Sequence, residues 1–172
     1  MARARTNNVS GRWPANGNAK AFTLVEVLVV VVIMAIAGAM IVPLMTGAGE
    51  MEALSAARVI ATDIQYAQSV AITMQTPVTV RFYPDTDRYT LSNASGLLKH
   101  PITNKDYQVN FRTQSGFEQV DLASANFGGS ASVVFDELGS PGAGGSVTVL
   151  GGSQTYRIDV TSVTGTVSVV AP

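Results

Sequence analysis

An uninterrupted apolar run near the N-terminus constrains this chain more than any other feature of its sequence. The 19 residues from Val27 to Met45 carry no charge. As a helix with a rise of about 1.5 Å per residue, the run would be about 28 Å long, close to the ~30 Å hydrocarbon core of a bilayer. A helix buried in a globular core keeps a polar face, and this segment has none. The run therefore predicts a membrane-spanning helix or the core of a signal peptide.

Charged residues are distributed unevenly on the two sides of this run. Residues 1–21 contain four basic residues and no acidic one, whereas Glu50 and Glu52 follow the run. The positive-inside rule places the N-terminus in the cytoplasm and the remainder across the membrane. The other 7 basic and 12 acidic residues give residues 22–172 a net charge of −5. Such a body does not favour nucleic acid as a partner, because that binding relies on neutralising phosphates.

A short motif directly precedes the apolar run. Ala21 is followed by Phe22-Thr23-Leu24-Val25-Glu26, which resembles the processing motif of type IV prepilins, a small residue before Phe-Thr-Leu-x-Glu. The resemblance implies cleavage between Ala21 and Phe22 by prepilin peptidase, and N-methylation of Phe22. Most members of that family carry Gly where this chain has Ala21. The resemblance also implies that Pro43 kinks the helix, as a proline does at this distance from the cut in many pilins.

Glu26 is the acidic residue that the motif places at the start of the apolar helix. A carboxylate in lipid costs a few kcal/mol on insertion scales, so it indicates a functional role unless it snorkels at the interface. In a stack of subunits, the new amino terminus of one chain can neutralise Glu26 of its neighbour. Removing either partner would leave a buried charge unpaired, at a cost of several kcal/mol. We therefore expect Glu26 to direct assembly.

A second helical segment is expected beyond the apolar run. Apolar residues recur at spacings of three and four along one face, with Arg58, Asp63 and Gln68 mostly off that face. Thr76-Pro77 ends the helix, and residues 47–49 favour a break between the two halves. The face is interpreted as packing against a head domain. Its members are Ala53, Ala57, Ile60, Ile64, Ala67, Ala71 and Met74.

After Pro77 the hydrophobic pattern changes to a period of two, which is typical of half-buried strands. Short strands with connections of hairpin length predict an antiparallel sheet, and one long helix before it makes the fold α+β. Residues 84–87 have turn chemistry rather than that of a calcium loop, because the ligand series stops at Arg88. The expected strands are 78–83, 88–92, 108–112, 117–122, 132–135, 147–150, 155–160 and 166–170.

The C-terminal half extends the resemblance. Phe135 to Pro141, with the preceding strand, and Thr164 to Val167 resemble the turn and the closing hairpin of the H-type minor pseudopilins of type II secretion and of related minor pilins. Residues 93–131 match no pattern of that family.

The sequence gives little support for a catalytic or metal-binding site. His100 is the single histidine and there is no cysteine, so neither a histidine-based metal site nor a thiolate zinc site can be built. No Gly-x-Ser-x-Gly elbow is present. We therefore expect no enzymatic activity, no cofactor and no bound metal.

These observations together predict a minor pilin or pseudopilin subunit of a type II secretion pseudopilus or type IV pilus. Its parts would be a leader (1–21), a transmembrane and assembly helix (22–76) and a β-rich periplasmic head (77–172). Its expected partners are prepilin peptidase, other pilin subunits and inner-membrane lipid. Two alternatives stay open. One is a competence minor pilin that takes up DNA, although residues 163–170 contain no Arg or Lys. The other is a secreted or periplasmic binding domain with an ordinary signal peptide cut after Ala37.

Overall fold

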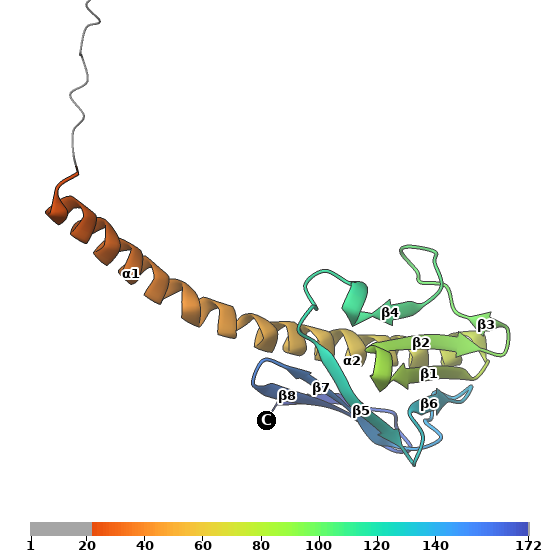
Figure 1. The fold of residues 1–172 in the computed structure, drawn as a ribbon. Coiled ribbons are helices and arrows are strands. Elements are labelled where there is room, and N and C mark those ends of the chain that lie inside the picture. The colour runs from red at the N-terminus through yellow and green to blue at the C-terminus, as the bar shows by residue number, and fades with distance from the viewer. Residues whose placement is uncertain (1–21, 172) are drawn as a thin grey trace, which may run out of the picture. The chain divides into compact units, whose positions relative to one another are not determined.

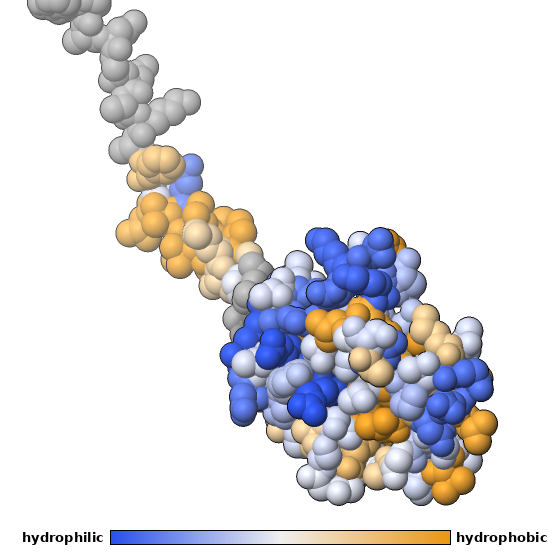
Figure 2. Space-filling model, turned by 90° about the vertical axis from the view of Figure 1, so that its right-hand side faces the viewer, coloured by the Kyte–Doolittle hydropathy of each residue, from blue (hydrophilic) through white to orange (hydrophobic). Residues whose placement is uncertain are grey.

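The computed structural model describes residues 22–171, except for the side chains of residues 40–46. Two units divide the chain, one ending at Met40 and the other beginning at Ile41. The first unit contains most of helix α1 (Leu24–Thr46), which spans 23 residues. Its large apolar side chains between Phe22 and Ile36 are 47–81% exposed, and Figure 2 shows hydrophobic residues over the visible face of this helix. None of the helices in the described part of the chain is both long and apolar enough to cross a membrane.

Helix α2 (Ala48–Met74) belongs to the second unit and follows a turn at Gly47. Six of the seven predicted apolar positions, from Ala53 to Ala71, are fully buried. Met74 is the exception, with 60% exposure, so its inclusion in the buried face was wrong. The helix ends at this residue because Gln75 adopts the left-handed conformation and its N–H bonds the Ala71 carbonyl. Met74 is the last residue of α2, and the two residues before it, Ile72 and Thr73, are exposed as well.

In the part of the chain that the structure describes, nine strands form two antiparallel sheets (Figure 1). The first has the order β3-β2-β1-β6, with β4 also paired to β2, and the second has the order β5-β7-β8-β9. The α+β class with antiparallel pairing is confirmed, although the predicted single sheet is divided into two. The elements are β1 (Val78–Tyr83), η1 (Pro84–Thr86), β2 (Arg88–Asn93), β3 (Gly96–Leu97), β4 (Gln108–Asn110), η2 (Phe111–Thr113), β5 (Asp121–Phe127), β6 (Ser132–Phe135), β7 (Gly145–Gly151), β8 (Gln154–Val160) and β9 (Val167–Val170).

Two predicted strands depart most from the structure, and four others differ from it by one or two residues at their ends. The strand expected over 108–112 stops at Asn110, because the Asn110 side chain accepts a hydrogen bond from the Arg112 N–H and the next three residues form the 3-10 turn η2. This turn buries Phe111. The strand expected over 117–122 begins only at Asp121 and continues to Phe127. Its two buried residues, Leu122 and Phe127, stand five positions apart, and the register shifts between Asp121 and Ser124. The sequence therefore shows no apolar alternation over this strand.

The core of the head lies between α2 and strands of both sheets, and α2 contacts β1, β6, β7, β8 and β9. The close approach of α2 to the β7–β8 hairpin depends on glycine. A Cβ atom at Gly151 would overlap the Gly49 carbonyl oxygen and lie 2.6 Å from the Ala53 Cβ. The largest fully buried side chains are Tyr89, Phe82, Phe111, Phe135, Ile60 and Ile64.

Candidate functional site

The processing motif lies at the N-terminal end of α1, where Thr23 caps the helix. The Thr23 Oγ1 atom accepts a hydrogen bond of 3.1 Å from the Glu26 N–H, and the Thr23 carbonyl accepts one of 3.2 Å from the Val27 N–H. Threonine at this position satisfies an amide that the helix itself leaves unpaired. Phe22 precedes the cap and is 78% exposed. Of the two residues that flank the predicted cut, the structure describes Phe22, whereas Ala21 lies outside the described residues.

The capping role of Thr23 was missed in the sequence, although the signal was present. A threonine followed three residues later by glutamate is the pattern of a capping box before an apolar helix. The same spacing puts Glu26 in the first turn of α1, where the positive end of the helix dipole favours a carboxylate. The motif therefore both starts the helix and positions the acid.

An apolar hollow adjoins Glu26 on the surface of α1. Its volume is about 310 Å³, and it is lined by Phe22, Glu26, Val27, Val30 and Val31. A side chain from another helix can occupy such a hollow beside the carboxylate. Pro43 lies within α1, but its side chain is outside the described ones, so the kink stays a prediction.

In the head, α2 carries a buried acid that the sequence did not single out. The Asp63 carboxylate accepts hydrogen bonds of 2.5 Å from the Tyr89 hydroxyl and 2.9 Å from the Tyr107 hydroxyl. Burial raises the pKa of Asp63 above its usual value of 3.8, and both tyrosine hydrogen bonds oppose this rise. Asp63 thereby ties α2 to β2 and to the segment that leads into β4.

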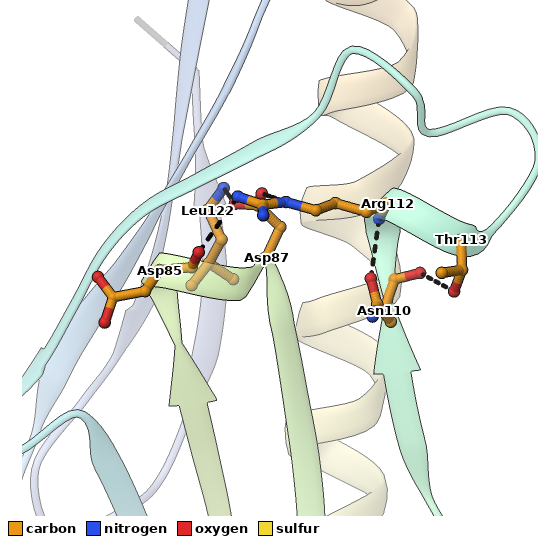
Figure 3. Close-up of polar contacts among 6 residues, drawn as sticks. All are labelled: Asp85, Asp87, Asn110, Arg112, Thr113 and Leu122. Carbon is orange, nitrogen blue, oxygen red and sulfur yellow. Dashed lines mark hydrogen bonds and ion pairs between the residues drawn. The ribbon is translucent and has the colours of Figure 1, made fainter.

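A second buried acid joins the β1–β2 connection to the rest of the head (Figure 3). Asp87 adopts a left-handed conformation at φ +47°. One of its carboxylate oxygens accepts from Arg112 Nε at 2.5 Å, and the other accepts from the Leu122 N–H at 3.0 Å. Arg112 also donates to the Asp85 carbonyl at 3.2 Å. The predicted turn over 84–87 is therefore confirmed, and Asp87 holds η2 and β5 in place.

His100 forms part of a turn. Its Nδ1 atom accepts hydrogen bonds from the Ile102 and Thr103 N–H groups, at 3.2 and 3.3 Å, and its ring lies 4.9 Å from that of Tyr107. By accepting these two hydrogen bonds, His100 Nδ1 stabilises the turn. No group of three or more potential metal-ligating side chains occurs within residues 22–171 as far as their side chains are described.

Two protein-family models match the chain, one over the N-terminal motif and one over the head. Residues 16–42 match the prokaryotic N-terminal methylation motif, and residues 56–165, more than half of the chain, match the type II transport protein GspH. None of the curated proteins compared with the chain matches it.

Solved structures share the fold. The minor pseudopilin EpsH from the type 2 secretion system of Vibrio cholerae is 17% identical, with a TM-score of 0.54 over 70% of this chain and 98% of that one. The type IV minor pilin FimU of Pseudomonas aeruginosa is 14% identical, with a TM-score of 0.52 over 72% of this chain and 94% of that one. A methylation-motif helix followed by an α+β head of this fold defines a pilin-like subunit. The chain belongs to the GspH family of type II transport proteins.

Proposed function

We propose that this chain is a minor pseudopilin that prepilin peptidase cleaves between Ala21 and Phe22 and methylates at Phe22. The observation that carries the proposal is the exposed Phe22 immediately before a helix capped by Thr23, within a match to the methylation motif. A residue outside the helix is accessible to a peptidase, because its backbone is not held in helical hydrogen bonds. The leader is then 1–21, the assembly helix 22–76 and the head 77–172.

The cut creates a positive amino terminus four residues before Glu26. In the assembled pseudopilus, this amine lies beside Glu26 of a neighbouring subunit, and the hollow lined by Phe22, Val27 and Val30 receives an apolar side chain. The pairing neutralises two charges in a medium of low dielectric constant and fixes the axial register. Pro43 bends the helix near the far end of the apolar run.

Before assembly, the chain waits in the inner membrane with its N-terminus in the cytoplasm and its head in the periplasm. The uncharged run from Val27 to Met45 and the four preceding basic residues support this orientation. The family match supports a type II secretion pseudopilus, whereas the likeness to FimU extends to the fold alone. The role is structural: the chain contacts other subunits and performs no catalysis.

Substituting Glu26 tests the proposal. Glu26→Leu is expected to leave cleavage and insertion intact and to abolish incorporation into sheared pseudopilus fractions. Glu26→Gln should also lose incorporation, because it keeps the size but removes the charge. Glu118→Gln, at an exposed acid of the head, is the matched control and should assemble normally. Normal incorporation of Glu26→Leu would contradict the pairing.

A further inference from the structure

One face of the first sheet carries two arginines on neighbouring strands. Arg81 of β1 is exposed, whereas Val80 and Phe82 on either side of it are buried, so Arg81 lies on the face turned away from the core. Arg88 of β2 is paired with Tyr83, two residues further along β1 (Figure 1). The two arginines are therefore diagonal neighbours on the same face, with Cβ atoms about 7 Å apart. We refer to Arg81 and Arg88 as the arginine pair.

Polar uncharged residues, rather than acids, lie beside the arginine pair. Thr90 of β2 and Ser132 of β6 are paired with Arg81, and Asn110 of β4 is paired with Arg88. The three ion pairs among the side chains that the structure describes lie elsewhere in the head. Two like charges without a counter-ion on one face create a positive potential, which favours the approach of an anion.

Arg88 is held in position but keeps an unused hydrogen-bond donor. Its Cζ atom lies 4.5 Å from the centroid of the Tyr83 ring, a distance at which a cation and an aromatic ring attract each other. Its Nε atom is buried and has no hydrogen-bond partner among the residues that the structure describes. Buried N–H donors are nearly always bonded, because an unpaired one has lost its hydration without compensation. The unpaired Nε atom therefore indicates that an acceptor from outside the chain completes this site.

A hollow of about 260 Å³ adjoins Arg81. It is lined by Arg81, Phe82, Tyr83, Ser130, Ala131 and Ser132, none of which is acidic. The hydroxyl groups of Ser130 and Ser132 lie 2.8 Å apart. One hydrogen bond between them uses only one of their two hydrogens, so the other hydroxyl can donate to a ligand. The hollow thus offers a guanidinium and a hydroxyl donor, which suit a carboxylate because an ionised carboxylate only accepts hydrogen bonds.

Size and charge favour one carboxylate over a larger anion. The hollow is smaller than the ~300–1,000 Å³ typical of small-molecule pockets, so it has room for an acidic side chain rather than a nucleotide. The ring of Tyr83 in its lining offers an apolar contact to the methylene groups of a glutamate. A nucleic acid would bring many phosphates against a body of net charge −5 over residues 22–172, which repels them.

We propose that the arginine pair binds an exposed glutamate or aspartate side chain of another protein. Arg81 donates two parallel hydrogen bonds to the carboxylate, and Arg88 supplies the second positive charge and its unpaired Nε donor. The hydroxyl pair of Ser130 and Ser132 donates a further bond from the opposite side of the hollow. This contact goes beyond the proposed assembly through α1, because it uses head residues alone and neither Phe22 nor Glu26.

Fluorescence anisotropy of a labelled peptide of alternating alanine and glutamate, titrated with the detergent-solubilised full chain at low ionic strength, tests the site. Saturable binding is expected, and the peptide with glutamine in place of glutamate should bind at least tenfold more weakly. Arg81→Gln should weaken binding about tenfold, the loss expected for a hydrogen bond to a charged group. Arg81→Lys should lose less, because it keeps the charge but not the two parallel bonds.

Arg58→Gln is the matched control, because Arg58 is an exposed arginine of α2, and it should change the affinity less than twofold. Arg88→Gln should also weaken binding about tenfold, and its thermal unfolding is measured alongside because Arg88 is half-buried. If that variant does not fold, the exposed Arg81 still decides the result.

Three outcomes would overturn the proposal. The first is no saturable binding of the glutamate peptide at millimolar concentrations, or equal binding of the glutamine peptide. The second is an equal loss of affinity for Arg58→Gln and Arg81→Gln, which would show attraction to positive charge in general. The third is displacement of the peptide by inorganic phosphate or a short oligothymidylate at lower concentrations than by unlabelled glutamate peptide, which would assign the arginine pair to phosphate.

Discussion

Replacing Tyr89 by phenylalanine removes one hydroxyl from the centre of the head and leaves its shape unchanged. This hydroxyl donates the 2.5 Å hydrogen bond to Asp63, and Tyr89 is fully buried. In the variant, the carboxylate keeps only the bond from Tyr107. A hydrogen bond to a charged group contributes about 1.5–3 kcal/mol, against about 1 kcal/mol for a neutral pair. We therefore expect Tyr89→Phe to lower the free energy of unfolding by about 2 kcal/mol where Asp63 is ionised.

The pH dependence of this loss follows from the direction of the pKa shift. Burial raises the pKa of Asp63 in the folded state above 3.8, so the folded chain retains this proton at higher pH than the unfolded chain. The contribution of Asp63 to stability therefore falls as the pH rises from about 3.8 through its folded-state pKa. The Tyr89 bond favours the ionised form. The penalty of Tyr89→Phe should be full above that pKa and should shrink to about 1 kcal/mol below it.

Thermal unfolding of the detergent-solubilised chain, followed by near-ultraviolet circular dichroism, measures the effect. A loss of 2 kcal/mol corresponds to a decrease in Tm of about 7 °C for a head of this size. Asp63→Asn should remove the pH dependence of the difference, and Tyr156→Phe, at a half-buried tyrosine, controls for the loss of a hydroxyl. An equal penalty for Tyr89→Phe at every pH, or no penalty at all, would refute a charged Asp63–Tyr89 hydrogen bond.

Two further substitutions test how the head is held together, both by the same unfolding measurement. Gly151→Ala should cost about 1–3 kcal/mol, because its methyl group meets the first turn of α2, whereas Gly47→Ala, with open space around it, should cost less than about 1 kcal/mol. Equal losses of stability for Gly151→Ala and Gly47→Ala would show that the close approach of α2 to the β7–β8 hairpin does not exclude a side chain at position 151. Arg112→Met should cost about 2–3 kcal/mol, because it leaves the buried Asp87 carboxylate with a single backbone donor. Arg157→Met, which breaks a largely exposed ion pair, should cost less than about 1 kcal/mol, and a larger loss there would contradict the ranking.

Local hydrophobic patterns in the sequence predicted much of the fold. The alternation in 78–83 predicted β1 with its observed bounds, because burial on one face selects apolar residues at every second position. The short apolar run in 132–135 likewise predicted β6 with its observed bounds. The spacing of three and four along α2 predicted the buried face from Ala53 to Ala71. The bounds of β5 were missed, because its two buried residues, Leu122 and Phe127, stand five positions apart and give no such signal.

Contacts between distant residues could not be predicted in this way. Asp63 was expected mostly off the buried face, yet it is buried because Tyr89 and Tyr107 supply hydrogen bonds from 26 and 44 residues away. Gln68 likewise reaches carbonyl groups 71 and 96 residues away. The Thr23 cap could have been predicted from the sequence, because a capping box is a local pattern.

The mature N-terminus of the chain isolated from membranes tests the central claim most directly. Intact-mass measurement and N-terminal sequencing should show that residues 1–21 are absent and that the chain begins with N-methylated Phe22. A chain that still carries the leader, or one that begins at Gly38 after an ordinary signal-peptide cut, has no amine beside Glu26 and would contradict assembly through this site.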